Sequence, residues 1–366
     1  MFFIRIFSYK SIYNVDMERN KKLDICKFFA MICIILAHSL QRTLPNFNNS
    51  FVGTFLVIFG LGIFFFVSGI SHGYRKPLKP LGFLYDILKR GLMYMWPIVL
   101  FLLLRVWLFN QWPTVDKAFG EFWEYPVMGM WFLWVLLWIN LTVDIGLLIS
   151  YFAPKYKKIF VTAMILVFYT LIIILREQNI IYLRTYLGYD YFVAYTPIFL
   201  FGYLFGDKLF TNINWKVSLS LICVGLVMSI LIVHYSEQMV VIDLPTHLPL
   251  FYIATTGTLL VYYGVSNLLN ETKVGNVFSY FGRFTLEAYF LHLMIVKNWG
   301  GMRITDQALC TGWTIGIFLA CIADIFAVLI ICYYVPFIHL LIFGKSWSRY
   351  KFEKNIFTKL KEIANK

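Results

Sequence analysis

Ten apolar segments follow one another along the chain, separated by short polar stretches. They cover approximately residues 23–42, 51–72, 84–108, 129–151, 158–176, 191–208, 216–234, 247–267, 277–297 and 311–343. A helix needs about 20 apolar residues to cross the hydrocarbon core of a bilayer, and it satisfies its own backbone hydrogen bonds there. The pattern therefore predicts an all-α fold, a polytopic transmembrane bundle of about ten helices. The last segment is long, and we expect it to bend near Pro336 or to continue as an interfacial helix.

The composition supports a membrane protein and excludes a soluble one. Hydrophobic residues make up 60% of the 366 residues and charged residues only 14%, with a mean hydropathy of +0.72. The loops are too short for a separate soluble catalytic domain, so any chemistry must take place within the bundle. The six Cys form no CxxC pair, and we interpret them as small buried hydrophobic residues rather than as a disulfide framework or a metal site.

The basic residues indicate the orientation of the chain rather than a nucleic-acid partner, although the net charge is +13. With the N-terminus in the cytoplasm, most Lys and Arg residues fall in inner loops and at the two ends, and the outer loop 235–246 has none. Both termini are therefore predicted to be cytoplasmic. We divide the chain into a basic N-terminal segment (1–22), a transmembrane domain (23–343) and a basic tail (344–366). The residues before Met17 are either an upstream extension or a misassigned start.

The first segment, LDICKFFAMICIILAHSL, contains three polar residues, whose burial in a membrane is unfavourable in free energy. Lys27 and His38 are eleven positions apart, which places them within about 20° on one helix face and about 16 Å apart along its axis. His38 lies in the outer part of the membrane, where it suits a general base that removes a proton from a hydroxyl. Lys27 lies near the cytoplasmic surface, where it is suited to bind an anion such as phosphate. Asp24 either neutralises Lys27 or shares its function.

Two further groups of polar residues lie near the cytoplasmic side. Ser68 and His72 are i,i+4 neighbours at the end of the second segment. They indicate either close helix packing or a Ser–His nucleophile pair, for which no acidic third member is recognisable. Lys89 and Arg90 open the third segment and are either membrane anchors or part of a basic mouth for an anionic cofactor. The other members of such a mouth are Arg75, Lys76 and Lys79.

The ninth segment, FSYFGRFTLEAYFLHLMIVKNW, contains a second histidine. This segment runs outward, so His292 reaches a depth comparable to that of His38, and Tyr289 is its i,i+3 neighbour. The two histidines are expected either to line one cavity or to make structural hydrogen bonds. Arg283 and Glu287 are expected to pair. Three more polar residues in apolar segments are expected to link helices: Asn140, Asp144 and Asp324.

These segments, in this order, resemble the acyltransferase-3 family of bacterial membrane O-acyltransferases. LDICKFFAMICIILAH resembles the first-helix pattern of the family, with Lys27 eleven positions before His38, and FFFVSG (64–69) is similar to its second-helix motif. LKRGLMYMWP (88–97) resembles the basic start of the third helix, but Met93 stands at the second basic position. Three later stretches are also similar to family motifs: MWFLWVLL (130–137), YTPIFLFGYLFG (195–206) and FTLEAYFLH (284–292).

The resemblance implies transfer of an acyl group, most often acetyl from cytoplasmic acetyl-CoA, to a hydroxyl of a cell-surface polysaccharide or lipid-linked glycan. It implies a multi-pass protein of the cytoplasmic (inner) membrane, with acyl-CoA as donor substrate and no permanently bound cofactor. By this analogy the residues take three roles: His38 as the catalytic base supported by Lys27 and Asp24, a donor-facing group of Lys27, Ser68, Lys89 and Arg90, and an acceptor-facing group of Glu287, Tyr289 and His292.

A transporter or flippase for a glycan or its lipid-linked precursor is the alternative. Intramembrane charges, Gly and Pro suit that function as well. It would predict paired broken helices in two related halves, and no such repeat is visible in the sequence.

Overall fold

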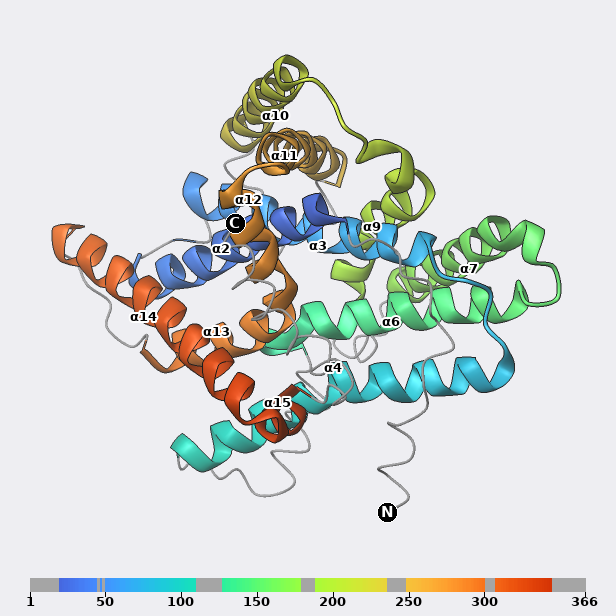
Figure 1. The fold of residues 1–366 in the computed structure, drawn as a ribbon, viewed down its shortest axis with the longest axis horizontal. Coiled ribbons are helices and arrows are strands. Elements are labelled where there is room, and N and C mark those ends of the chain that lie inside the picture. The colour runs from blue at the N-terminus through green and yellow to red at the C-terminus, as the bar shows by residue number, and fades with distance from the viewer. Residues whose placement is uncertain are drawn as a thin grey trace.

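The computed structural model describes residues 20–44, 47, 50–109, 127–178, 188–235, 248–299 and 307–343, and these residues form helices without any strand. The predictions for the N-terminal extension and for the basic tail (344–366) lie outside the described residues. Figure 1 shows the arrangement of the helices. In chain order they are α2 (Lys21–Thr43), α3 (Phe51–Gly73), α4 (Pro80–Phe109), α6 (Val127–Ile149), η2 (Pro154–Tyr156), α7 (Lys157–Glu177), α9 (Tyr189–Leu209), α10 (Trp215–Tyr235), α11 (Leu248–Leu269), α12 (Lys273–Phe281), η4 (Gly282–Phe284), α13 (Thr285–Trp299), α14 (Gln307–Tyr334) and α15 (Pro336–Phe343).

The all-α membrane bundle is confirmed, and most predicted segments match one helix to within a few residues. The ninth segment is different, because 277–297 is not one helix but is broken by η4 into α12 and α13. The last segment bends at Pro336, as expected, because proline cannot continue the helical hydrogen bonds. Among the described residues, seven helices are long and apolar enough to cross a membrane. The number of spans beyond these seven, and the side on which the termini lie, stay predictions.

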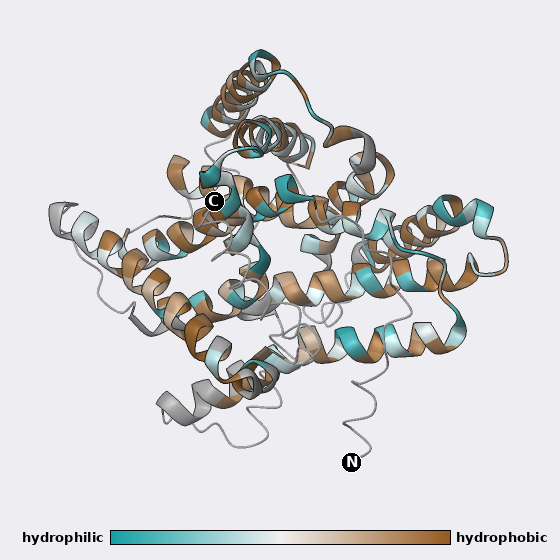
Figure 2. Ribbon diagram, in the orientation of Figure 1, coloured by the Kyte–Doolittle hydropathy of each residue, from teal (hydrophilic) through white to brown (hydrophobic). Residues whose placement is uncertain are grey.

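The helices divide into an inner and an outer set. In the membrane-spanning windows of α2, α3 and α6, 56–67% of the residues are buried, whereas α7, α10 and α14 have only 17–22% buried. Large apolar side chains cover the exposed faces of the outer set, which suits contact with lipid rather than with water. Hydrophilic residues gather at the right-hand side of Figure 2, where the connection from α3 to α4 runs.

Small residues allow the closest helix contacts. A Cβ at Gly69 would lie 2.0 Å from the carbonyl oxygen of Phe199, and one at Gly202 would lie 2.2 Å from that of Phe66. These contacts bring the backbones of α3 and α9 together, as small residues do in many membrane helix pairs. Gly257 has the same function between α10 and α11, which lie side by side at the top of Figure 1.

Helix α2 occupies the centre of the bundle, where it contacts α3, α11, α12, α13 and α14. Its first turn is fixed by the buried Lys22, whose Nζ donates to the carbonyl oxygen of Thr211 and to Oδ1 of Asn267, each at 2.7 Å. The break between α12 and α13 lies against the same turn. A Cβ at Gly282 would lie 1.9 Å from the carbonyl oxygen of Asp24. Only a glycine lets η4 approach α2 this closely, so the break fixes where α13 stands beside α2.

Gly282→Ala should therefore destabilise the protein. The added methyl group must push η4 away from the backbone of α2, and such overpacking costs about 1–3 kcal/mol. We expect a lower apparent melting temperature for the purified protein in detergent, measured by loss of the monodisperse species after heating. Gly316→Ala on α14 is the matched control, because an added Cβ meets nothing within 4 Å there. Equal melting temperatures for Gly282→Ala and the unaltered protein would contradict this account of the break.

Candidate functional site

The structure brings His38 of α2 and His292 of α13 together. Their ring centroids are 5.3 Å apart, with an angle of 34° between the planes. His292 is completely buried, whereas His38 is partly exposed. His38 and His292, which were expected at comparable depth, are therefore neighbours although their helices are far apart in the chain.

Each histidine is oriented by a hydrogen bond from Nδ1 within its own helix. Nδ1 of His38 lies 3.0 Å from Oε1 of Gln41, and Nδ1 of His292 lies 3.1 Å from the carbonyl oxygen of Ala288. Both partners are oxygens that accept, so Nδ1 carries the hydrogen in each neutral ring. The basic lone pair is then on Nε2. This tautomer is the one that a histidine needs in order to remove a proton through Nε2.

Aromatic rings extend from the histidine pair to α6 and α9. The ring of Tyr289 lies 5.3 Å from that of His292 and 5.0 Å from that of Phe132. At the start of α6, Trp131 stacks on Tyr191 of α9 with 4.0 Å between centroids. Neither Trp131 nor Tyr191 was among the site residues predicted from the sequence, although Trp131 lies within the motif-like stretch 130–137.

Lys27 and Asp24 form an ion pair near the start of α2, with 2.6 Å between Nζ and Oδ1. The Asp24 side chain is 2% exposed and that of Lys27 is 21% exposed. A buried carboxylate needs a cation beside it. The structure thus favours the interpretation in which Asp24 neutralises Lys27, and the pair has no net charge.

Four charged residues form a second cluster between α4, α6 and the connection from α3 to α4. Asp144 of α6 forms ion pairs with Arg90, at 2.8 Å, and with Arg75, which also binds Asp86. Arg90 reaches the carbonyl oxygen of Asn140 as well, at 3.2 Å. Asp144 and Asn140 therefore link helices, as expected. The two arginines and two aspartates balance in charge. The cluster is therefore close to neutral and is not a purely cationic mouth.

The connections around this cluster are fixed by hydrogen bonds. Leu78 donates its backbone N–H to the carbonyl oxygen of Leu147 at 3.0 Å, and Lys157 donates to the carbonyl oxygens of Gly73 and Arg75. Lys89 stands apart from the cluster. It is exposed, and its ammonium group lies 5.8 Å from the centre of the Tyr85 ring.

Ser68 and His72 make a local contact. Nδ1 of His72 lies 2.7 Å from the backbone carbonyl oxygen of Ser68, not from its hydroxyl, and the ring packs 5.5 Å from that of Phe199. His72 is buried. This contact supports the packing interpretation, because a nucleophile pair requires the ring nitrogen to accept from the serine hydroxyl.

Glu287 contacts His339 of α15, a partner that the sequence did not indicate. Nε2 of His339 lies 3.2 Å from Oε1 of Glu287, and both side chains are buried. The contact fixes α15 against α13, the helix that carries His292. The expected pairing of Glu287 with Arg283 stays a prediction. In the part of the chain that the structure describes, no three His, Cys, Asp or Glu side chains are arranged to hold a metal ion.

The whole of this site lies within one recognisable domain. A family model of the acyltransferase-3 type, described as an acyltransferase domain, matches residues 20–347. Comparisons with curated proteins and with solved structures found no match. The family match extends over nearly the whole chain and includes every residue of the site described above. The chain therefore belongs to the acyltransferase-3 family and is a multi-pass membrane acyltransferase.

Proposed function

We propose that the protein transfers an acyl group from cytoplasmic acyl-CoA to a hydroxyl of a cell-surface polysaccharide or lipid-linked glycan. It would do so in the cytoplasmic membrane, with His38 as general base. The acyl group that we expect is acetyl. The observation that carries the proposal is the contact between His38 and His292, because it places an oriented basic nitrogen inside the bundle of a family of acyltransferases. Family membership also favours the transferase over the transporter that the sequence left open.

The chemistry assigned to His38 is general base catalysis. Nε2 of His38 takes the proton of the acceptor hydroxyl while its oxygen attacks the thioester carbonyl. A C–O bond forms, the C–S bond breaks, and the proton passes to the departing thiolate. Gln41 keeps His38 in the required tautomer through its contact with Nδ1. His292 lies next to His38, and Tyr289 lies next to His292. Both are assigned to the acceptor, together with Glu287, which holds α13 against α15.

The donor is assigned to the cytoplasmic end of the bundle. Arg90 has five N–H donors, and its bonds to Asp144 and Asn140 orient the guanidinium and leave donors for a phosphate. Arg75 binds the same carboxylate. It therefore supplies a second guanidinium beside Arg90. This chain lacks a cation at the second basic position of the family motif, where Met93 stands.

Three other residues complete the proposed donor side. Lys27 would hold its anion with its ammonium group, because the side chain remains 21% exposed beside Asp24. Lys89 would contribute from the exposed face of α4, and Ser68 from α3 one turn before His72.

His38→Ala should abolish most of the transfer. Loss of a general base typically lowers the rate by about 10²–10⁴-fold, and we expect that loss in label moved from radiolabelled acetyl-CoA to envelope glycan in isolated membranes. His234→Ala is the matched control, because His234 is exposed on α10, away from the histidine pair. Full transfer by His38→Ala at equal protein level would refute the assigned role.

Arg90→Gln should raise the KM for acetyl-CoA about tenfold and change kcat less. One lost charge-assisted hydrogen bond is worth about 1.5–3 kcal/mol, part of which Arg75 retains. Arg75→Gln should have the same direction of effect, because both arginines bind Asp144. Lys216→Gln serves as the control, since Lys216 is an exposed basic residue at the start of α10. An unchanged KM in both arginine variants would remove this cluster from the donor site.

A further inference from the structure

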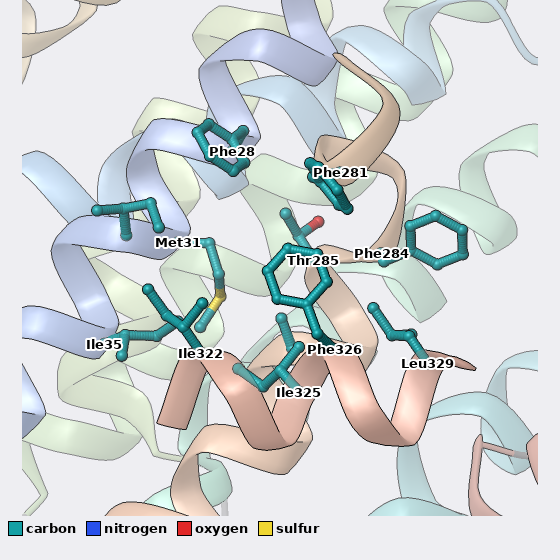
Figure 3. Close-up of a pocket in the computed structure, with 12 residues that line it drawn as sticks. Phe28, Met31, Ile35, Phe281, Phe284, Thr285, Ile322, Ile325, Phe326 and Leu329 are labelled. Carbon is teal, nitrogen blue, oxygen red and sulfur yellow. The ribbon is translucent and has the colours of Figure 1, made fainter. Parts of the chain in front are cut away.

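A crevice between α2, α13 and α14 has almost wholly apolar walls (Figure 3). Its one polar side chain, Thr285, donates its hydroxyl to the carbonyl oxygen of Gly282 at 3.3 Å. Walls of this kind do not distinguish one ligand from another by hydrogen bonding. Two buried polar groups near Arg90 can do so, because each has an atom that lacks a hydrogen-bond partner among the described residues.

His72, near the end of α3, is the first of these groups. Its ring is buried and packs 5.5 Å from that of Phe199. Nδ1 lies 2.7 Å from the carbonyl oxygen of Ser68, which only accepts, so Nδ1 carries the hydrogen and Nε2 of the neutral ring is an acceptor. Nε2 is also buried, and it has no partner in the part of the chain that the structure describes. Because Arg90 and Arg75 are close enough to act electrostatically on this ring, the unused acceptor belongs to the charged cluster.

Asn140 of α6 provides a second buried acceptor beside Arg90. Its backbone carbonyl oxygen accepts from Nη1 of Arg90 at 3.2 Å, and its side-chain Nδ2 donates to the hydroxyl oxygen of Tyr94 at 3.2 Å. Oδ1 of this fully buried side chain has no partner within the described ranges. Nη1 of Arg90 also makes the ion pair with Asp144, so the N–H groups on Nη2 can donate to a ligand. The cluster therefore offers a ligand both hydrogen-bond donors and hydrogen-bond acceptors.

This combination favours an amide over a phosphate as the group bound next to Arg90. The oxygens of a phosphate are acceptors, so a phosphate there would leave the acceptor atoms of His72 and Asn140 unsatisfied, which is unfavourable for buried groups. An amide has a carbonyl oxygen that accepts and an N–H that donates. It is also neutral, and it therefore suits a cluster in which two arginines are balanced by two aspartates.

We propose that this site binds the amide-containing arm of the donor's carrier, with an amide carbonyl oxygen accepting from Arg90 and amide N–H groups donating to His72 and Asn140. The inference rests on the proposed function, in which the donor is acyl-CoA, and it names the part of the donor that this site binds. The arm of CoA contains two amides between its phosphates and its thioester. The phosphates then belong to the outer side of the cluster, where Lys76 and Lys79 are exposed. His72 is a positioning residue that holds the arm and so directs the thioester.

The first test compares ligands on the unaltered, purified full-length protein and needs no acceptor. It measures how radiolabelled acetyl-CoA is displaced by CoA and by two CoA analogues, in each of which an ester oxygen replaces one amide N–H. We expect at least one ester analogue to bind about fivefold or more weakly than CoA, because a buried acceptor of the protein is then left without its donor. Equal affinities for all three ligands would overturn the inference.

The second test assigns the lost hydrogen bond to His72. His72→Phe keeps a ring beside Phe199 but has no acceptor nitrogen, so it should bind CoA about fivefold or more weakly and lose the preference for CoA over the ester analogue. His72→Gln can place Oε1 near the position of Nε2 and should keep that preference. The nucleotide 3′-phospho-ADP has the phosphates of CoA without the arm and should bind equally to all these proteins. His234→Phe, at an exposed histidine of α10, is the matched control and should change no affinity.

Two outcomes separate a structural role from the proposed one. Equal weakening of CoA and 3′-phospho-ADP in His72→Phe, with the preference for the amide intact, rejects the inference and leaves the proposed function standing. If His72→Phe does not fold, the comparison of ligands on the unaltered protein decides the question. Absence of acetyl-CoA binding and of transfer in the unaltered protein rejects the proposed function itself, and the inference with it.

Discussion

Polar groups within a bilayer have no water to bind, so each one requires a partner from the protein. Helix α2 contains several such groups near the centre of this bundle, and the partners that they require determine how the neighbouring helices are arranged around it. Lys22 requires Thr211 and the end of α11, while Asp24 requires Lys27. The bare backbone at Gly282 fits against this same turn. Once these partners are in place, α13 has one position beside α2, and that position brings His292 to His38.

The positions of most helices along the chain could be predicted from the sequence, because hydropathy marks each apolar segment. Helical rise gave His38 and His292 a comparable expected depth, and the two rings do lie beside one another. The break at η4 could not be predicted, since the apolar pattern is continuous across it and its cause is a backbone contact with Asp24. The contact of Glu287 with His339 was missed for a similar reason. It depends on how α15 turns back after Pro336, which a hydropathy pattern does not specify.

The cationic residues near the start of α2 and around the connection from α3 to α4 are less available than their number suggests. Lys27 is neutralised by Asp24, and the charges of Arg75 and Arg90 are balanced by Asp86 and Asp144. An anionic ligand at this end must therefore share these cations with carboxylates that already bind them. Such sites distinguish one anionic ligand from another by geometry and not only by charge attraction, because the carboxylates hold each guanidinium in a fixed direction. The sequence indicated Arg75 only as one member of a basic mouth, whereas the structure shows that it joins the connection after α3 to α4 and α6 through Asp86 and Asp144.

The short length of α13 has a consequence for how the site is enclosed. Its 15 residues correspond to about 22 Å, less than the roughly 30 Å of a typical hydrocarbon core. Helix α13 is therefore too short to cross the bilayer alone, and its residues from Ala288 to Leu293 are buried in the protein. His292 stands midway along α13, about 10 Å from either end. The ring of His292 is thus surrounded by neighbouring helices rather than by lipid, and whatever reaches it must pass between protein side chains.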